Sequence, residues 1–154
     1  MRNSAAQALT GRAVGYHRWD VRWRYQYEEG PGSCGVSDVT IDLSSTITLP
    51  DWVGGPSADS SLVTAWEAYV TSLRYHEYCH RVLAYQQANE IYRELKRERS
   101  GSCALLRGRV ESKGRAILEK YKKLNEEFDQ DSRGYIRWPP RTDERIPPPC
   151  PMGW

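Results

Sequence analysis

Arg74-Tyr75-His76-Glu77-Tyr78-Cys79-His80 lies near the middle of this 154-residue chain, and the other segments can be interpreted around it. The stretch contains His-Glu-x-x-His, the motif of zinc peptidases when it lies on a helix. On a helix, His76 and His80 project from one face about one turn apart, so two imidazole nitrogens can reach one ion. Glu77 lies on the flank of that face, where a carboxylate can hold an attacking water and accept its proton. We therefore expect a zinc site with His76 and His80 as ligands and Glu77 as the catalytic base.

A buried helix face is the alternative explanation of the two histidines. Several large apolar residues fall near the same side of the helical wheel: Trp66, Tyr69, Leu73, Leu83 and Ile91. Against this explanation, two ionisable rings and a carboxylate on an apolar face need partners, and one divalent cation satisfies all three. We therefore prefer the metal site.

Upstream of the motif the sequence alternates as a half-buried strand does. Aromatic and apolar residues occupy the odd positions from Trp19 to Tyr27, and polar residues lie between them. Such a row is more typical of a core than of a platform for stacking nucleic-acid bases. After a turn at residues 29–33, a second apolar set shares one parity: Val39, Ile41, Leu43, Ile47 and Leu49. This set predicts one strand, or two short ones broken near Ser44-Ser45.

The motif itself falls within a long predicted helix. Ser60 or Ser61 can cap its start, and the helical pattern continues to about Arg99. Its length indicates either one unbroken helix or two helices joined by a bend before Tyr75. The motif therefore meets the condition that it lies on a helix.

A last helix is predicted from Cys103 to just before Gly134. Its apolar residues follow a helical period: Leu106, Val110, Ala116, Ile117, Leu118, Tyr121, Leu124 and Phe128. The order of elements predicts an α+β fold, in which a small antiparallel sheet from the N-terminal half is followed by two long helices.

Length and charge limit the possible classes of function. The chain is long enough for one domain with a core. We expect a lead-in at residues 1–15, a single domain at 16–137, and a tail at 138–154 that contains six prolines. The formal net charge is +2 and basic residues are interspersed with acidic ones, so no nucleic-acid partner is expected. No apolar run has the length of a transmembrane helix.

The four cysteines, Cys34, Cys79, Cys103 and Cys150, allow three fully paired connectivities. Their spacing fits neither a zinc knuckle nor a redox pair, so disulfides in an extracytoplasmic compartment are the preferred use. We therefore expect a secreted or periplasmic protein. Residues 1–6 do not form a signal peptide, so the leader of such a protein would be absent from this chain.

Cys79 lies within the motif but about 80° from the ligand face, so it is not expected to bind the same ion. It can pair with Cys150, which would bring the proline-rich tail over the helix. Alternatively, Cys150 in Pro149-Cys150-Pro151 can block the zinc as an inhibitory thiolate. A tail without a disulfide is the third possibility.

Several segments taken together resemble one bacterial family. The matching pieces are Gly15-Tyr16, Trp19-Asp20-Val21-Arg22-Trp23, Cys34-Gly35-Val36, Ile47-Thr48-Leu49-Pro50, Trp52, Trp66, Leu73, the motif with Arg81, Ser102-Cys103, Gly114 and Asn125-Glu126-Glu127-Phe128-Asp129. This ordered set, from about Gly11 to Gly134, is similar to a largely uncharacterised family of secreted zinc-dependent proteases filed as a domain of unknown function. The resemblance implies a zincin-like domain outside the cytoplasm, and it implies that Cys34 pairs with Cys103.

One segment departs from the family pattern. The family has an aromatic residue and Asp followed shortly by Thr-x-His-Gly, whereas this chain continues from Phe128-Asp129 to Gly134-Tyr135 without a histidine. If that histidine is the family's third ligand, this chain has lost it.

A catalytic zinc usually has three protein ligands and one open position, so a third ligand is needed. Asp129 is our choice, because it lies at the end of a helix long enough to pack against the motif helix and within a segment that matches the family. Its competitors are Asp131, Glu126, Glu111 and His17. The other acidic residues of this helix are more simply explained as solvated surface.

These residues predict a zinc metallopeptidase that binds one zinc ion per chain and hydrolyses a peptide or protein substrate. Glu77 would accept the proton of the attacking water and return it to the leaving amine. Tyr135 and Arg133 are candidate donors to the oxyanion. A peptide can also add as a strand to an exposed edge of the sheet.

Two other functions stay open. The missing histidine and the short chain favour a catalytically silent, zinc-stabilised binding domain. Retention of Glu77 favours the enzyme, because a purely structural metal site needs no carboxylate between its ligands. Hydrolysis of cell-wall peptide amides shares the same chemistry and cannot be separated by sequence. The oligomeric state is not predicted.

Overall fold

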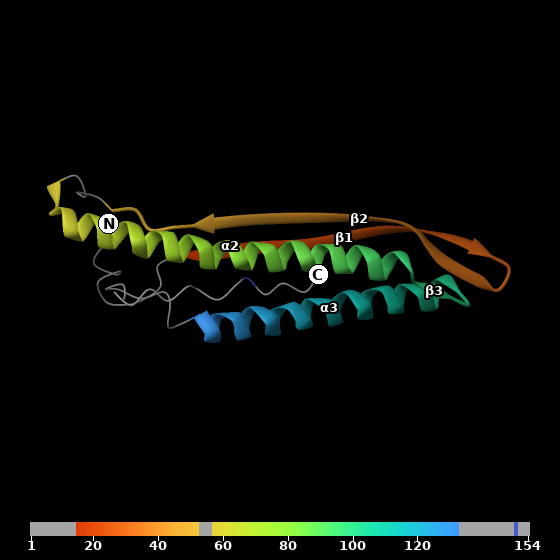
Figure 1. Cartoon of the computed structure of the whole chain (residues 1–154). Helices are drawn as coiled ribbons and strands as arrows, with labels where there is room; N and C mark the ends of the chain where they lie inside the picture. Colours follow the sequence, from red (N-terminus) through yellow and green to blue (C-terminus); the bar gives the residue numbers. More distant parts are fainter. Residues whose placement is uncertain (1–14, 53–56, 133–149, 151–154) are drawn as a thin grey trace. The chain divides into compact units, whose positions relative to one another are not determined.

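The computed structural model describes residues 15–52, 57–132 and 150 (Figure 1). Its elements follow in the order β1 (Tyr16–Gly30), β2 (Ser33–Thr48), α2 (Ser60–Lys96), β3 (Arg99–Ser100) and α3 (Cys103–Ser132). A small antiparallel sheet with two long helices is the α+β architecture that the sequence predicts. The short strand β3 lies between the helices and was not predicted, since two residues are too few to show a period.

The chain divides into two compact units, and each is described by itself. The described residues of the first unit are 15–18, 46–52, 57–81, 126–132 and 150, and those of the second are 19–45 and 82–125. The single domain at 16–137 stays a prediction. The lead-in and the proline-rich tail lie outside the described residues, apart from Gly15 and Cys150.

The sheet has the strand order β1-β2-β3. β2 and β3 are antiparallel, with Cys34 opposite Ser100 and Gly35 opposite Arg99. The two residues between β1 and β2 are Pro31 and Gly32, and Gly32 has a φ of 66°. Proline followed by a residue with positive φ is the pattern of a type II turn, and glycine is the residue that adopts this φ without strain.

β2 is one continuous strand, so the break considered near Ser44-Ser45 is absent. Ser44 is exposed and Ser45 is half-buried, which continues the period-two alternation of the neighbouring residues. Small hydroxyl side chains fit the pleat without interrupting the backbone pairing, and the pattern of exposure is kept. β1 is also longer than the alternation predicted, since it begins at Tyr16.

Helix α2 is a single helix that passes through the motif without ending before Tyr75. Its N-cap is Asp59, whose Oδ1 accepts hydrogen bonds from Ser61 N at 2.8 Å and Ser61 Oγ at 2.5 Å. The prediction of Ser60 or Ser61 as the cap was therefore wrong by one or two residues. α2 ends at Lys96, three residues before Arg99, because Arg99 and Ser100 pair with β2 instead.

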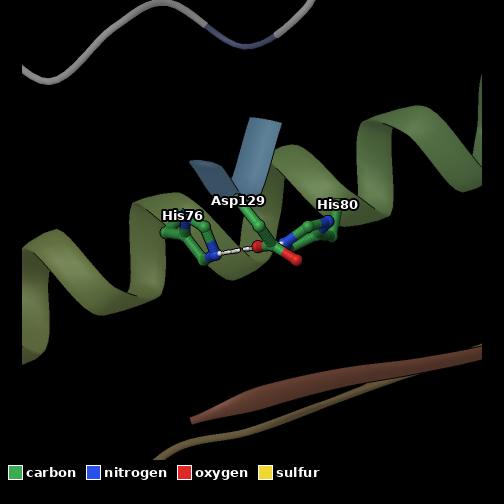
Figure 2. A group of neighbouring side chains, drawn as sticks. All are labelled: His76, His80 and Asp129. Carbon is green, nitrogen blue, oxygen red and sulfur yellow. Dashed lines mark hydrogen bonds and ion pairs between the residues drawn. The ribbon is translucent and has the colours of Figure 1, made fainter. Parts of the chain in front are cut away.

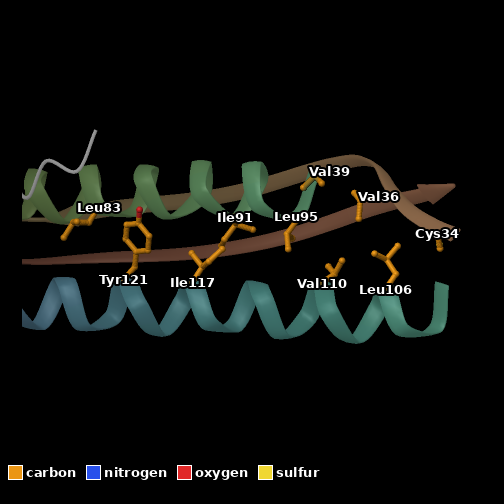
Figure 3. Close-up of a cluster of buried hydrophobic side chains, with 10 residues drawn as sticks. All are labelled: Cys34, Val36, Val39, Leu83, Ile91, Leu95, Leu106, Val110, Ile117 and Tyr121. Carbon is orange, nitrogen blue, oxygen red and sulfur yellow. The ribbon is translucent and has the colours of Figure 1, made fainter. Parts of the chain in front are cut away.

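A hydrophobic core fills the second unit, with side chains from β2, α2 and α3 (Figure 3). Its buried members are Cys34, Val36, Val39, Leu83, Ile91, Leu95, Leu106, Val110, Ile117 and Tyr121. Cys34 and Cys103 form a disulfide that joins β2 to the first residue of α3, as the resemblance implies. The bridge spans 69 residues of sequence, so it stabilises the fold by about 4 kcal/mol in the chain-entropy model.

The face of α3 that packs differs slightly from the predicted one. Ala116 was expected on the packed face and is exposed, whereas Gly114 is buried. A Cβ at Gly114 would lie 2.5 Å from Cζ2 of the Trp23 indole ring. Trp23 therefore lies against the helix backbone itself, which is possible only where α3 has no side chain.

Substitution of Gly114 tests this contact. We expect Gly114→Ala to destabilise the protein by about 1–3 kcal/mol, because the large indole ring must move out of a well-packed position. Gly108→Ala on the same helix is the matched control, since a Cβ there meets nothing within 4 Å. It should stabilise α3 by about 0.5–1 kcal/mol through helix propensity. Urea unfolding measures both, and equal effects of the two substitutions would contradict the packing.

Glu98 is a buried carboxylate in the second unit, with 5 % of its side chain exposed. It accepts a hydrogen bond from Arg109 Nε at 3.0 Å, and its other oxygen lies 3.0 Å from Lys113 Nζ. Burial by itself would raise the pKa of Glu98. The hydrogen bonds from Lys113 and Arg109 outweigh burial, so the net pKa of this carboxyl is lowered from its usual value of 4.5.

We expect Glu98→Gln to lower the free energy of unfolding by about 1–3 kcal/mol at neutral pH. The folded-state pKa lies below the unfolded one, so the stabilisation by Glu98 is fully present above the unfolded pKa and is lost as pH falls through the folded pKa. The difference between wild type and variant in urea unfolding should therefore be smaller at about pH 3 than at about pH 7. Glu94→Gln is the control, because Glu94 forms a more exposed ion pair with Arg97. It should change the free energy of unfolding by less than about 0.5 kcal/mol.

Candidate metal centre

The first unit holds both histidines of the motif on α2 and Asp129 near the end of α3 (Figure 2). The four-residue spacing places the rings of His76 and His80 one turn apart, and their Nε2 atoms are separated by 3.0 Å. Oδ1 of Asp129 lies 3.1 Å from Nε2 of His76 and 2.9 Å from Nε2 of His80. Two nitrogens and one oxygen therefore converge on one point.

This triangle has nearly the dimensions of one face of a zinc tetrahedron. Ligand atoms about 2.0–2.1 Å from zinc, at tetrahedral angles, are separated from each other by about 3.3 Å. The observed separations of 2.9–3.1 Å are shorter by a few tenths of an ångström. Within the described part of the chain, these are the three residues that form a group able to hold a metal ion. A small outward movement of the side chains would accommodate the ion.

The two nitrogens of each imidazole ring have different surroundings in this group. The two Nε2 atoms lie 3.0 Å apart, and both lie against Oδ1 of Asp129, so either protons or a cation can occupy the space between these three atoms. With both Nε2 atoms as ligands, each ring carries its proton on Nδ1. Nδ1 of His76 is buried and has no hydrogen-bond partner among the described residues. In most metal sites the second ring nitrogen of a histidine ligand donates a hydrogen bond to an acceptor. His76 has no such acceptor for Nδ1 among the described residues.

Phe128 orients both rings. Its ring is stacked on His76 at a centroid distance of 4.9 Å and an interplanar angle of 17°, and it meets the edge of His80 at 5.3 Å and 79°. Phe128 is buried, with 5 % exposure. Because Asp129 is the next residue on α3, the packing of Phe128 against the two imidazoles also brings the carboxylate to them.

The group is closed on the side of α2 and open at the carboxylate. The side chains of His76 and His80 are 12 % and 8 % exposed, whereas that of Asp129 is 53 % exposed. A site buried on one side and accessible on the other can admit a substrate beside the ion. Burial alone would raise the pKa of Asp129, but its hydrogen bonds with His76 and His80 outweigh burial and hold that pKa well below the usual 3.8. Asp129 is therefore ionised at neutral pH.

Glu77 follows His76 on α2 and is buried, with 4 % exposure. Burial raises the pKa of Glu77 above its usual 4.5; the neighbouring histidines oppose this, and the charge of Asp129 adds to it. The carboxylate also accepts a hydrogen bond from the main-chain N–H of His17, at the start of β1. A carboxylate with a raised pKa is a stronger base than an exposed one, which suits proton abstraction from water.

The competitors for the third ligand lie elsewhere. Asp131 and Glu126 are exposed and outside the group, and Glu111 belongs to the second unit. His17 is near His80 but is also outside the group. Its pKa is lowered to about 4 by burial and by the proximity of His80 and Arg81, so its ring is neutral at pH 7.

The predicted oxyanion donors Tyr135 and Arg133 lie outside the described residues. Two features of the site were missed in the sequence. Phe128 was assigned only to the core, although its position beside Asp129 was a usable signal. The contribution of His17 is made by a main-chain N–H, which leaves no signal in the identity of a side chain.

A second disulfide joins Cys79 of the motif to Cys150. Cys79 is fully buried, and the backbone N–H of Cys150 donates a hydrogen bond to the Tyr75 hydroxyl at 3.2 Å. Of the alternatives left open by the sequence, the Cys79–Cys150 pair is therefore the one present. The inhibitory thiolate is wrong, because the sulfur of Cys150 is already bonded.

Fold and site define an α+β protein with a group of two histidines and one carboxylate. A family model described as "Bacterial protein of unknown function (DUF922)" matches residues 1–135, and the chain belongs to this family. Comparison with curated proteins and with solved structures gave no match. None of the helices in the described ranges is long and apolar enough to cross a membrane. Membership of a bacterial family of unknown function is therefore confirmed, while zinc proteolysis, secretion and the likeness to zincins stay predictions.

Proposed function

We propose that this protein is a zinc-dependent metallopeptidase, with His76, His80 and Asp129 as metal ligands and Glu77 as the general base. The observation that carries the proposal is the convergence of three ligand atoms within 3.1 Å of one another, with the buried carboxylate of Glu77 beside them on α2. A purely structural metal site would need a fourth ligand. Among the described residues the group has three, which leaves a position open.

Zinc is the ion that this ligand set favours for hydrolysis. Two imidazoles and one carboxylate form the protein ligands of known catalytic zinc sites. The same combination also binds iron(II) in oxygenases, and metal analysis of the purified protein distinguishes zinc from iron. The presence of Glu77 directly after a ligand favours the hydrolytic use, because a positioned base is needed to activate water.

Each residue has a separate task in the proposed reaction. When bound, zinc makes a water molecule more acidic and polarises the scissile carbonyl. Glu77 accepts the proton from the attacking water and later donates it to the leaving amine. Asp129 and the two imidazoles hold the ion, and Phe128 keeps both rings in place. Peptide or protein is the substrate class, and an oxyanion donor from residues 133–135 stays a prediction.

The two disulfides support an extracytoplasmic site of action. Disulfides persist in oxidising compartments, and both pairs join segments about 70 residues apart in the sequence. We propose that the protein acts in the periplasm or outside the cell. Separation of a periplasmic extract from spheroplasts of an expressing strain tests this, and recovery of the mature protein only with reduced cysteines would contradict it.

A catalytically silent, metal-stabilised binding domain is the second candidate. The chain lacks the histidine that the family pattern has after Asp129, and this departure favours a weakened site. Cell-wall peptide amides are a further substrate class for the same chemistry. Metal analysis combined with cleavage of a mixed peptide library separates the candidates. We expect about one zinc per chain and cleavage that a chelator abolishes. A folded protein that holds no metal, even after zinc is added, would overturn the site.

A further inference from the structure

Gly15, the residue before β1, packs against α2 one helical turn before Glu77. A Cβ at Gly15 would lie 2.9 Å from Cγ and Cδ2 of Leu73, which is fully buried. Real side chains do not approach so closely, so a larger residue at this position would force the Leu73 side chain to move. The backbone at Gly15, the residue before β1, therefore lies directly against the Leu73 side chain of the helix that carries the motif.

Two residues further along, the main-chain N–H of His17 donates a hydrogen bond to the carboxylate of Glu77. Two strand residues advance by about 6.6 Å, and the four helical residues from Leu73 to Glu77 advance by about 6.0 Å. The strand and the helix therefore advance by nearly the same distance between the Gly15–Leu73 contact and the His17–Glu77 contact. Gly15, His17, Leu73 and Glu77 all belong to the first unit.

The N–H of His17 is available because of the position of β1 in the sheet. β1 is an edge strand in the order β1-β2-β3. In an antiparallel pair, successive residues direct their N–H groups alternately toward the partner strand and away from it. The N–H of His17 is directed toward Glu77, so it serves the carboxylate without loss of a bond between β1 and β2. With 4 % exposure, Glu77 has little access to solvent donors, and this bond replaces one of them.

We propose that Gly15 and the first residues of β1 are a positioning element for the catalytic base. Gly15 sets the distance between strand and helix, and the main-chain N–H of His17 holds one carboxylate oxygen of Glu77, which leaves the other oxygen for the attacking water. His17 acts through Glu77 and is a positioning residue. The inference rests on the proposed function, because it assigns a task to the base of that reaction.

Proline at position 17 removes the N–H and is compatible with an edge strand when the lost N–H faces away from the sheet. We expect His17→Pro to lower kcat by about 10- to 100-fold, with KM and zinc content unchanged, because only the base is misplaced. His17→Ala keeps the N–H, so its kcat should stay at least about tenfold above that of His17→Pro. Tyr27→Pro, at an exposed position of the same strand and parity, controls for proline in β1 and should leave kcat unchanged.

A second measurement does not depend on activity. The chain has three histidines, so labelling with 15N-histidine gives three amide signals, and His17→Ala identifies that of His17. We expect this amide to be protected from hydrogen exchange in the folded, zinc-loaded protein. In Glu77→Ala, which lacks the acceptor, it should exchange about tenfold faster or more. Gly15→Ala, in which the added methyl group meets Leu73, should reduce the protection in the same direction.

These experiments distinguish a failure of this inference from a failure of the proposed function. An unchanged exchange rate of the His17 amide in folded Glu77→Ala would overturn the inference, whether or not the protein cleaves peptides. Equal kcat values for His17→Pro and His17→Ala would also overturn it. Absence of cleavage by the wild type would overturn the proposed function alone, and the exchange measurement would still decide whether His17 holds Glu77.

Discussion

Glu77→Gln should lower kcat/KM for peptide cleavage by about 10²- to 10⁴-fold and leave the zinc content at about one ion per chain. The amide of glutamine has nearly the shape of the carboxylate, so it fills the same buried position and still accepts a bond from the His17 N–H. It cannot accept a proton from water. Glu77 is not a member of the ligand group, so the ion should stay bound.

The measurement is the rate of cleavage of a mixed peptide library, together with metal analysis of the same preparations. Glu67→Gln is the matched control, because Glu67 is an exposed residue of α2 in the same unit. It carries the same change of charge and should cleave at the wild-type rate. Cleavage by Glu77→Gln at that rate would exclude Glu77 as the base. Zinc without cleavage in any preparation would favour the silent binding domain or a cell-wall substrate.

Removal of the proposed third ligand, Asp129, should also have a large effect. We expect Asp129→Ala to weaken zinc binding by about 100-fold or more, because it removes one of the three proposed ligands and the carboxylate among them. The zinc-dependent rise in Tm should be lost with it, since a ligand stabilises the folded state in proportion to its affinity. Titration with a competing chelator measures the affinity, and thermal unfolding with and without zinc measures the stabilisation.

Asp131→Ala is the control for this experiment. Asp131 lies two residues further along α3, is exposed, and is outside the ligand group, so its loss changes the net charge equally. Its affinity for zinc should stay within about threefold of the wild type, because an exposed charge is largely screened. Equal effects of the two substitutions would mean that both carboxylates attract zinc only through their negative charge, and that Asp129 does not coordinate it. An unchanged affinity in Asp129→Ala would place the third ligand elsewhere.

Much of the local structure is predictable because it depends on residues close in the sequence. The alternation from Trp19 to Tyr27 predicts the strand that is observed, and the helical period predicts α2 and α3. The wrong prediction of the N-cap of α2 also has a local cause. Asp59 precedes two serines, each of which is an equally good cap by residue type, so sequence alone could not choose between them.

Which acidic residue of α3 meets the two histidines depends on contacts between distant parts of the chain. Asp129 and Asp131 differ by about 200° around a helix, so at most one of them can face α2. Which one faces it depends on the packing of Phe128 against His76 and His80, a contact between residues about 50 positions apart. No period within α3 contains that information.

By itself, the sequence determined the α+β class, the helix that carries His76, Glu77 and His80, and the spacing that directs both imidazoles to one side. These follow from backbone geometry, which repeats over a few residues. Only the tertiary structure decided that Asp129 meets the two rings, that Cys79 pairs with Cys150, and that the N–H of His17 reaches Glu77. Such contacts form when distant segments pack together, and their energies depend on burial and distance, which residue order alone does not specify.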